Sequence, residues 1–260
     1  MSVKSKVFAA AASLTLVGGA GVAGLATAGT ANAATSECGI QCWDIFSPEF
    51  GHHNSPNFVV DAYKQGQSVG TPIILFQVSN SDPAEDFTVG TPDRVSDYWQ
   101  AGLVTSEVAL HYGCEAGVDF ANCSGTGGNG VNDFAFEIQY APYGAPTGNC
   151  VGVAATATSG AKVSLQPCGV SGKTLWILDT LDAPFIDFHT GYFPLINGSD
   201  TNFSQPFVLT YPGGGYPTNT PRPQLEVTNL SGTVINPLSP VVQDVNSNQL
   251  WGADFGQLVP

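Results

Sequence analysis

Residues 149–176 read NCVGVAATATSGAKVSLQPCGVSGKTLW, and this stretch decides the fold. It begins with an apolar run that ends at Val153, passes through a turn-rich segment, and then alternates side-chain character from Lys162 to Leu165. Alternation with a period of two is typical of a half-buried β-strand. A large aromatic residue, Trp176, closes the stretch. We therefore expect two β-strands joined by a turn and followed by an aromatic side chain in the core.

The same order of features occurs in two other parts of the chain. Each copy ends with a large aromatic residue: Phe87, Trp176 or Trp251. Three copies of one unit indicate an all-β fold with pseudo-threefold repeats, in which one aromatic residue per copy fills a common core. The copies comprise residues 57–60, 70–76 and 85–87; residues 149–153, 160–168 and 173–176; and residues 206–209, 223–227 and 248–251.

Short apolar runs bounded by turn residues predict the strands. Only residues 96–110 have a composition that suits a helix, but Gly102 and the β-branched residues around it favour a strand there. Long loop insertions are expected after Phe87 and after Leu225. The predicted strands are residues 58–60, 72–76, 135–140, 162–165, 175–178, 207–211 and 224–227.

The repeat resembles the ricin-type β-trefoil, a lectin-like family whose repeats end in a Gln-x-Trp signature. The third copy contains this signature at Gln249-Leu250-Trp251, and the second copy matches the rest of the pattern best. The resemblance covers residues 57–255 and implies a β-trefoil fold. It also implies a disulfide between Cys150 and Cys168.

In this family, a sugar pocket uses an Asp two residues after the opening Cys, a Gln and an aromatic residue that flank a Leu, and an Asn-Gln pair before the Trp. An aromatic face stacks on the sugar while the carboxylate and amides bind its hydroxyls. The second copy departs from the pattern at every position, so we expect no family pocket there. Its residues at these positions are Gly152, Ser164, Gln166, Lys173 and Thr174.

The first copy places Val60 at the Asp position, with Asp61 one residue late. A shift of one residue turns a strand side chain to the opposite face, so this alignment argues against a family pocket. The other residues of this copy at the pocket positions are Ile74, Phe76, Ala84 and Glu85.

The third copy keeps Gln224, Asn248 and Gln249 but has Leu209 and Glu226 where an Asp and an aromatic residue are needed. Tyr211 or Tyr216 can replace the missing aromatic residue. The resemblance therefore assigns ligand binding to Gln224, Asn248, Gln249 and Tyr211. The alternative is that Gln249 and Trp251 only stabilise the core.

Residues 1–33 have the features of a secretory signal peptide. Lys4 and Lys6 precede an apolar stretch at 7–26, and Ala31-Asn32-Ala33 forms a small-x-small cleavage pattern. A retained membrane anchor is the alternative, but the stretch is rich in Gly and no basic cluster follows it. We expect an N-terminal segment at 34–55 and one all-β domain at 56–260.

The chain is strongly acidic, with 7 basic and 21 acidic residues and a net charge of −14. So few cations cannot neutralise a phosphate backbone or an anionic bilayer. We therefore expect no nucleic-acid partner, and no membrane association once the signal peptide is removed. The charge itself names no partner, because it also keeps an exported protein in solution.

An even number of cysteines in an exported chain indicates disulfides. Their clustering favours three local bridges, Cys38–Cys42, Cys114–Cys123 and Cys150–Cys168, although other pairings remain open. A zinc site is the rival reading, but no His lies at a Cys/His ligand spacing. A loop as short as that of Cys38–Cys42 can carry strain, which weighs against this pair.

Motifs for catalysis or for metal binding are weak throughout the chain. No nucleophile elbow, zinc-protease motif or phosphate-binding loop occurs. His52 and His53 point to opposite faces of an extended chain, and His189 near Asp187 has no nucleophile beside it. We therefore predict no catalytic residue, no metal site and no cofactor.

We interpret two stretches with acidic or oxygen-bearing side chains as turns. Asp82, Glu85 and Asp86 lie together around Pro83, where Asp82 suits the start of a turn. Oxygen ligands alternate at Asn197, Ser199 and Asp200, but an Asn-Gly turn explains that run without calcium.

These observations favour a secreted, extracellular, noncatalytic binding protein, with a glycan as the expected partner. One alternative is a secreted hydrolase that acts on an extracellular polymer with loop carboxylates. The other is a trefoil-type protease inhibitor that uses the loop at 113–131.

Overall fold

The computed structural model describes residues 42–52, 55–79, 81–113, 133–178, 192–213, 217, 222–231 and 245–255. The chain divides into two units, Met1–Ala34 and Thr35–Pro260, and every described residue belongs to the second. The predicted signal peptide and the residues Cys38, Cys114 and Cys123 lie outside the described residues, as does nearly all of the loop at 113–131.

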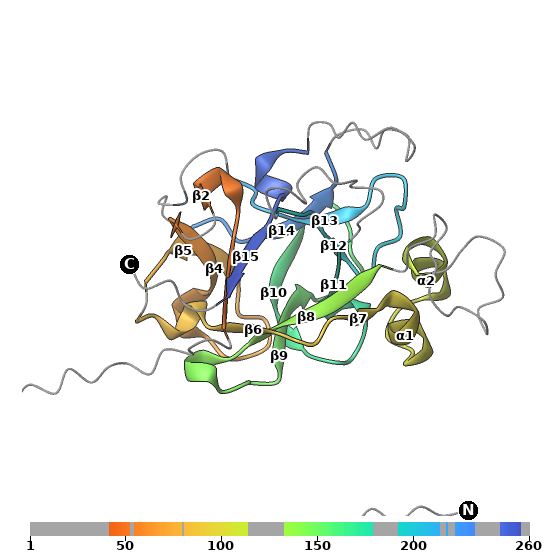
Figure 1. The fold of residues 1–260 in the computed structure, drawn as a ribbon, viewed down its shortest axis with the longest axis horizontal. Coiled ribbons are helices and arrows are strands. Elements are labelled where there is room, and N and C mark those ends of the chain that lie inside the picture. Colours follow the sequence, from red (N-terminus) through yellow and green to blue (C-terminus); the bar gives the residue numbers. More distant parts are fainter. Residues whose placement is uncertain are drawn as a thin grey trace, which may run out of the picture. The chain divides into compact units, whose positions relative to one another are not determined.

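The described part is built from three four-stranded units (Figure 1), and in each unit the second and third strands form an antiparallel hairpin. The first unit consists of β1 (Trp43–Phe46), β4 (Phe58–Ala62), β5 (Ile73–Gln77) and β6 (Phe87–Val89). The second consists of β8 (Phe134–Tyr140), β9 (Asn149–Val153), β10 (Ala161–Pro167) and β11 (Leu175–Leu178). The third consists of β12 (Leu195–Asn197), β13 (Phe207–Thr210), β14 (Glu226–Asn229) and β15 (Gly252–Phe255).

The first and fourth strands of the three units close into a ring. β1 pairs with β6, β6 with β8, β8 with β11, and β11 with β12. A bridge between Phe193 and Trp251 joins the start of β12 to β15, and β15 pairs with β1. Ring closure satisfies the backbone groups that an open sheet would leave at its edges.

The three hairpins meet through their third strands in a repeated register. Pro72 pairs with Ser164, Lys162 with Glu226, and Gln224 with Ile74. Each unit therefore pairs with the next through the same two positions, and the third returns to the first. A six-stranded ring joined to three hairpins around such an axis is a β-trefoil, so the fold predicted from the sequence repeats is confirmed.

One aromatic residue from each unit lies in a single core, as predicted. Phe87, Trp176 and Trp251 are all buried in the same cluster. The Trp176 indole donates to the carbonyl of Val151 at 3.0 Å, and the Trp251 indole donates to the carbonyl of Leu209 at 2.8 Å. These bonds satisfy the two buried indole N–H groups at equivalent places in the second and third units.

The insertion after Phe87 contains helices, so the strand predicted at 96–110 is wrong. It comprises β7 (Asp93–Arg94), α1 (Val95–Gln100) and α2 (Ser106–Tyr112), with the two helices side by side in Figure 1. The Thr105 hydroxyl accepts from the Val108 N–H and caps α2. Val108 and Tyr112, one turn apart, pack in a second cluster with Leu175 of β11. Tertiary packing and the cap outweigh the low helix propensity of the β-branched residues.

Residues 43–46 form β1 and are therefore part of the trefoil, although the sequence predicted an N-terminal segment at 34–55 ahead of the domain.

Single turns of 3-10 helix precede the fourth strand of each unit: η4 (Pro83–Glu85), η7 (Gly172–Thr174) and η8 (Ser247–Gln249). The remaining described elements are η2 (Pro48–Phe50), β2 (Gly51–His52), β3 (Ser55–Pro56), η3 (Tyr63–Gln65) and η6 (Pro142–Gly144).

The predicted bridge between Cys150 and Cys168 is present, with the two Cα atoms 5.1 Å apart, and it ties the start of β9 to the turn after β10. Cys42 is also disulfide-bonded. None of the helices in the described ranges combines the length and apolar character that a bilayer crossing requires.

Candidate functional site

The hairpin registers show which residues of the three units are equivalent. Asp61 lies opposite Ile74 in the first hairpin, and Gly152 lies opposite Ser164 in the second. Because Ile74 and Ser164 occupy the same position in the ring of third strands, Asp61 is the counterpart of Gly152. The alignment of Val60 with Gly152 is therefore wrong by one residue. The first copy has no opening Cys, so its short apolar run offered no fixed point for the alignment.

With Asp61 in its correct place, three carboxylates of the first unit lie close together in the structure. Asp61 comes from β4, Glu85 from η4, and Asp82 immediately precedes η4. One carboxylate oxygen from each lies within 4.8 Å of the other two. Asp82 also caps η4, because its Oδ1 accepts from the Ala84 N–H at 3.0 Å. The turn inferred for this run is thus real, and it also positions the acids.

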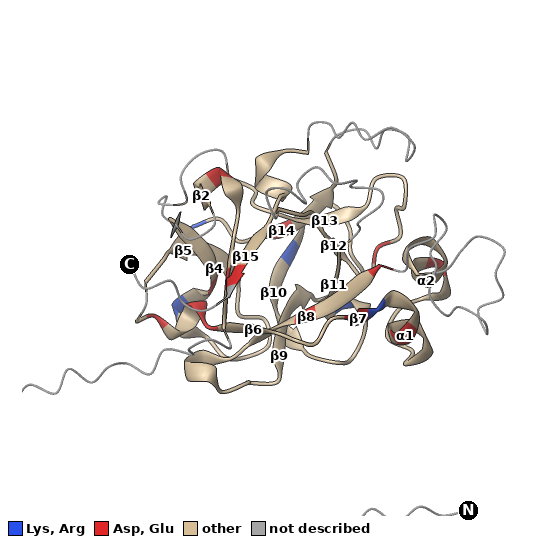
Figure 2. Cartoon of the chain, in the orientation of Figure 1, with Lys and Arg blue, Asp and Glu red and all other residues tan. Residues whose placement is uncertain are grey.

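The carboxylate cluster borders a cavity of about 260 Å³. We call this cavity, together with Glu85 behind it, the first-copy pocket. Figure 2 shows acidic and basic segments next to each other beside β4, where the pocket lies. The lining residues are Asp61, Tyr63, Lys64, Gln65, Phe76, Asp82 and Ala84.

Three buried polar atoms around the first-copy pocket have no hydrogen-bond partner among the described residues. They are Oε1 of Glu85, the hydroxyl oxygen of Tyr140 and Nη1 of Arg222. Glu85 is only 3% exposed, and its other oxygen accepts from the Ser79 N–H at 2.8 Å. Nearly all buried polar groups in folded proteins are hydrogen-bonded, so three unpaired groups near one another mark this region as the candidate site.

Burial and mutual repulsion shift the titration of these acids. Burial raises the pKa of Asp61 to about 7; Asp82 adds to the rise, and Arg222 opposes it. Burial also raises the pKa of Glu85 to about 9; the Ser79 N–H opposes this rise, and Asp61, Asp82 and Asp44 add to it. Strongly shifted carboxyl groups beside a cavity are typical of functional sites.

Aromatic and cationic side chains line the rest of the first-copy pocket or lie next to it. Arg222 is outside the lining, but its guanidinium carbon lies 3.4 Å from the centre of the Phe76 ring and covers one face of that ring. Tyr63 is 39% exposed, and the Lys64 Nζ lies 5.1 Å from the centre of its ring. The pocket therefore combines acceptors, donors and an accessible aromatic side chain.

Backbone strain is concentrated around the same place. Lys64, Gln65 and Tyr143 are the non-glycine residues with positive φ in the described ranges, at 56°, 57° and 56°. Lys64 and Gln65 line the pocket, and the Gln65 amide donates to Asp82 at 3.1 Å. The Tyr143 N–H donates to Asp86, the residue after Glu85, at 2.6 Å. Strained non-glycine conformations cluster at ligand-binding sites because the surrounding structure must enforce them.

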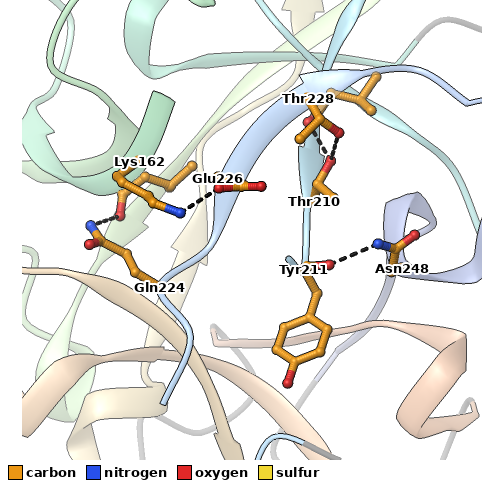
Figure 3. Close-up of polar contacts among 9 residues, drawn as sticks. Lys162, Thr210, Tyr211, Gln224, Glu226, Thr228 and Asn248 are labelled. Atoms are coloured by element: carbon orange, nitrogen blue, oxygen red, sulfur yellow. Dashed lines mark hydrogen bonds and ion pairs between the residues drawn. The ribbon is translucent and has the colours of Figure 1, made fainter. Parts of the chain in front are cut away.

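The residues predicted to bind ligand in the third copy have other partners (Figure 3). The Gln224 amide donates to the Val163 carbonyl at 2.8 Å, and the Asn248 amide donates to the Tyr211 carbonyl at 2.8 Å. The Tyr211 side chain is buried and packs edge-to-face on Phe50. These contacts account for the residues structurally, and their ligand-binding role stays a prediction.

Gln249 is the most completely bonded of the predicted ligand residues. Its Oε1 accepts from the N–H and hydroxyl of Ser231 at 2.7 and 2.6 Å. Its amide donates to the Thr228 hydroxyl at 2.8 Å and to the Asn229 carbonyl at 2.9 Å. This network matches the alternative weighed for Gln249, a residue that stabilises the core.

In the second copy, the backbone itself fills the position that corresponds to Asp61. A Cβ on Gly152 would lie 2.5 Å from the carbonyl oxygen of Lys173. Any larger residue would therefore force the η7 turn away from β9, and no acid can stand there without that change.

The remaining candidates from the sequence are explained by turns or lie outside the described residues. Asn197 Oδ1 accepts from the Ser199 N–H and hydroxyl, and Asp200 accepts from Asn202, Phe207 and the Tyr112 hydroxyl. His53, Asp187 and His189 lie outside the described residues.

A second cavity of about 190 Å³ lies between strands of the ring and has a different character. Apolar side chains line it, among them Trp43, Phe136 and Trp251. It presents no charged group or side-chain amide to a ligand, so it does not match a polar partner.

No protein-family model matches the chain, and no curated protein matches it in sequence. Several solved structures are similar in backbone. A designed threefold-symmetric protein, ThreeFoil, has a TM-score of 0.42 and 11% identity over 81% of this chain and 96% of its own. A mosquitocidal holotoxin has a TM-score of 0.44 and 11% identity, and the match spans 84% of this chain but 18% of the toxin.

An SDF2-like protein from Arabidopsis thaliana is also similar, with a TM-score of 0.38 and 8% identity over 84% of this chain and 94% of its own. Likenesses this distant carry no information about function. The trefoil assignment rests on the strand pairing, and the functional argument rests on the first-copy pocket.

Proposed function

We propose that this chain is an exported, noncatalytic binding protein whose first-copy pocket holds one sugar residue of an extracellular glycan. The observation that carries the proposal is the set of unpaired groups of both kinds at one pocket. Glu85 accepts while its carboxyl is ionised and can also donate while it is protonated, whereas Arg222 Nη1 can only donate. Sugar hydroxyls donate and accept, so one sugar ring can satisfy both groups.

The size and lining of the pocket support a small polyhydroxylated ligand. Its volume of about 260 Å³ lies below the range of about 300–1,000 Å³ that holds drug-sized ligands. Tyr63 offers a ring to the C–H face of a sugar, in the way that aromatic residues do at carbohydrate sites. One terminal or side-chain sugar fits this space better than a continuous polymer.

Export is proposed on the signal-peptide pattern of residues 1–33 and on the Cys150–Cys168 bridge. Stable disulfides form in oxidising compartments and are rare in the cytosol. An acidic protein with a stapled hairpin is suited to work outside the cell.

The test is a glycan array followed by titration of the bound saccharide against matched variants. Asp61→Asn and Tyr63→Ala should each lower the affinity at least about tenfold, a change of about 1.4 kcal/mol. Asn248→Ala and Gln224→Ala, which alter the third copy, should leave the affinity unchanged.

Two outcomes would overturn this proposal. Loss of binding in the third-copy variants alone would move the site to the residues that the family resemblance indicated. Release of reducing ends from a polysaccharide panel would show a hydrolase instead, since a binding protein leaves its ligand intact.

A further inference from the structure

The three carboxylates of the first-copy pocket have the geometry of a cation site. Oxygens of Asp61, Asp82 and Glu85 all lie within 4.8 Å of one another. Ca²⁺ binds oxygen at about 2.3–2.6 Å, so ligands on opposite sides of one ion are about 4.6–5.2 Å apart. A single ion can therefore contact an oxygen from each of the three residues.

A buried, unpaired oxygen within the cluster, Glu85 Oε1, and a second one outside it, the Tyr140 hydroxyl, point to a ligand. Glu85 is 3% exposed and Tyr140 is 0% exposed, and neither Glu85 Oε1 nor the Tyr140 hydroxyl has a partner in the described part of the chain. The Tyr140 hydroxyl lies close enough to these acids for Asp61, Asp86 and Asp82 to act on it electrostatically. A cation would give the Glu85 oxygen the partner that no donor supplies.

Among the described residues, neither Lys64 nor Arg222 forms an ion pair with Asp61, Asp82 or Glu85. Asp44 adds a fourth carboxylate that acts on Glu85. Arg222 lies close enough to influence Asp61 but, among the described residues, forms no ion pair with it and stacks on Phe76 instead. Buried charges are normally paired or bound to a metal ion.

The trefoil framework itself does not require acids at these positions. The second unit has Gly152, Ser171 and Thr174 at the places of Asp61, Asp82 and Glu85. The third unit has Thr210, Asn246 and Gln249 there. Six uncharged residues support the same local backbone, so the acids of the first unit serve something other than the fold.

From this geometry, we infer that Asp61, Asp82 and Glu85 together bind one hard divalent cation of the Ca²⁺ class. Ligands that are all oxygen select hard cations over zinc or copper. Mg²⁺ is the weaker fit, because it demands near-ideal octahedral geometry and gives up its water reluctantly. The inference rests on the proposed function, since the open positions of the ion would take hydroxyls of the sugar in the same pocket.

The test uses the full secreted protein, stripped with a chelator and titrated with Ca²⁺ alone by calorimetry. Tb³⁺ luminescence, sensitised by the neighbouring Tyr63 and Tyr140, gives a second readout that Ca²⁺ should reverse. We expect saturable binding of one ion per chain, with a dissociation constant of about 10⁻⁴–10⁻³ M, as in other extracellular modules.

Matched variants locate the ion. Asp61→Asn and Glu85→Gln should each weaken Ca²⁺ binding at least about tenfold. Asp97→Asn and Glu107→Gln make the same changes at exposed acids of the inserted helices and should leave it unchanged. Absence of saturable binding in the wild type, or equal binding in Asp61→Asn and Glu85→Gln, would overturn the inference.

Two further measurements keep the result independent of variant folding and of the sugar. Ca²⁺ should raise the melting temperature of the wild-type protein, since a ligand that binds only the folded state stabilises it. Sugar binding that persists in chelator, without Ca²⁺ binding, would contradict the cation and leave the proposed function standing. Ca²⁺ binding without any glycan ligand would support the cation site and contradict the proposed sugar binding.

Discussion

Glu85 and Gln249 occupy the same position in the first and third units, and both are 3% exposed. Gln249 places both ends of its amide in hydrogen bonds to Ser231, Thr228 and Asn229. Glu85 accepts one hydrogen bond, from Ser79, and leaves its other oxygen unpaired.

The difference between these two residues distinguishes a position that stabilises the fold, Gln249, from a position in the candidate site, Glu85. Thr210 in β13 and Asp61 in β4 also occupy the same position in their units. The Thr210 and Thr228 hydroxyls form a hydrogen bond of 2.8 Å, whereas the Asp61 carboxylate repels that of Glu85. The third unit thus closes its polar groups on one another, and the first unit leaves them available. Equal burial with opposite hydrogen bonding is the observation on which the proposed ligand site in the first unit depends.

The largest predicted effect comes from making the third unit resemble the first. Gln249→Glu removes the donor to Thr228 and Asn229 and buries a carboxylate oxygen against the Asn229 carbonyl. At neutral pH, the free energy of unfolding should fall by about 3 kcal/mol. Denaturant unfolding measures this loss.

Asn248→Ala, which removes the one bond to the Tyr211 carbonyl, is the control and should lower the free energy of unfolding by about 1 kcal/mol. Equal losses for the two variants would remove the distinction between the units.

The next effect concerns the pH dependence of stability in chelator. The folded-state pKa of Glu85, about 9, lies above its ordinary value of 4.5. The protonated carboxyl therefore contributes stability below about pH 4.5, and this contribution is lost as the pH rises through about 9. Wild-type protein should lose on the order of 1–3 kcal/mol between about pH 5 and about pH 8.

Glu85→Gln removes this group and should make the profile less steep, leaving the loss that Asp61 contributes as the pH rises through its folded-state pKa of about 7, while Glu107→Gln should keep the wild-type slope. Unfolding at a series of pH values measures both. A wild-type profile as flat as that of Glu85→Gln would show that Glu85 is not the buried, repelled group described here.

A smaller effect is expected from Tyr63→Ala, which should separate binding from stability. The ring is 39% exposed, so its loss should change the free energy of unfolding by less than about 0.5 kcal/mol. Sugar affinity should fall about tenfold because the stacking surface is removed. Tyr143→Ala, also at an exposed ring, is the control for stability. A large loss of stability in Tyr63→Ala would assign the ring a structural role.

The smallest effect should come from the Lys162–Glu226 ion pair between β10 and β14, visible in Figure 3. The Lys162 side chain is 53% exposed, and water screens exposed pairs. Lys162→Ala should therefore lower stability by about 0.5 kcal/mol or less in denaturant unfolding. A loss of stability as large as that of Gln249→Glu would show that the contribution of a polar contact to stability does not depend on its burial.

The repeats were enough to predict the trefoil, because core residues can be recognised in the sequence by their large side chains and their regular spacing. Phe87, Trp176 and Trp251 stand at one point of each copy, and the Cys150–Cys168 bridge followed from the family resemblance. The helices at 95–112 were missed because a cap at Thr105 and packing against β11 outweigh weak propensity.

The candidate site was harder to predict, since it depends on register and on distant partners. A one-residue error placed Asp61 on the wrong face, and only pairing with Ile74 corrects it. Tyr140 and Arg222 come from other units, and no local pattern links them to Asp61. A search for acids at both the Asp and the Asn-Gln positions of one copy, with a one-residue tolerance, would have found Asp61 with Glu85.

The central claim is that the first-copy pocket, and not its third-unit counterpart, takes the ligand. The most direct test is an NMR titration of labelled protein with the saccharide selected on the array, in the presence of Ca²⁺. The account predicts saturable shifts of backbone signals around Asp61, Lys64 and Ala84, with those of Thr210 and Asn248 unchanged. Shifts centred on Thr210 and Asn248, with a silent first unit, would contradict it.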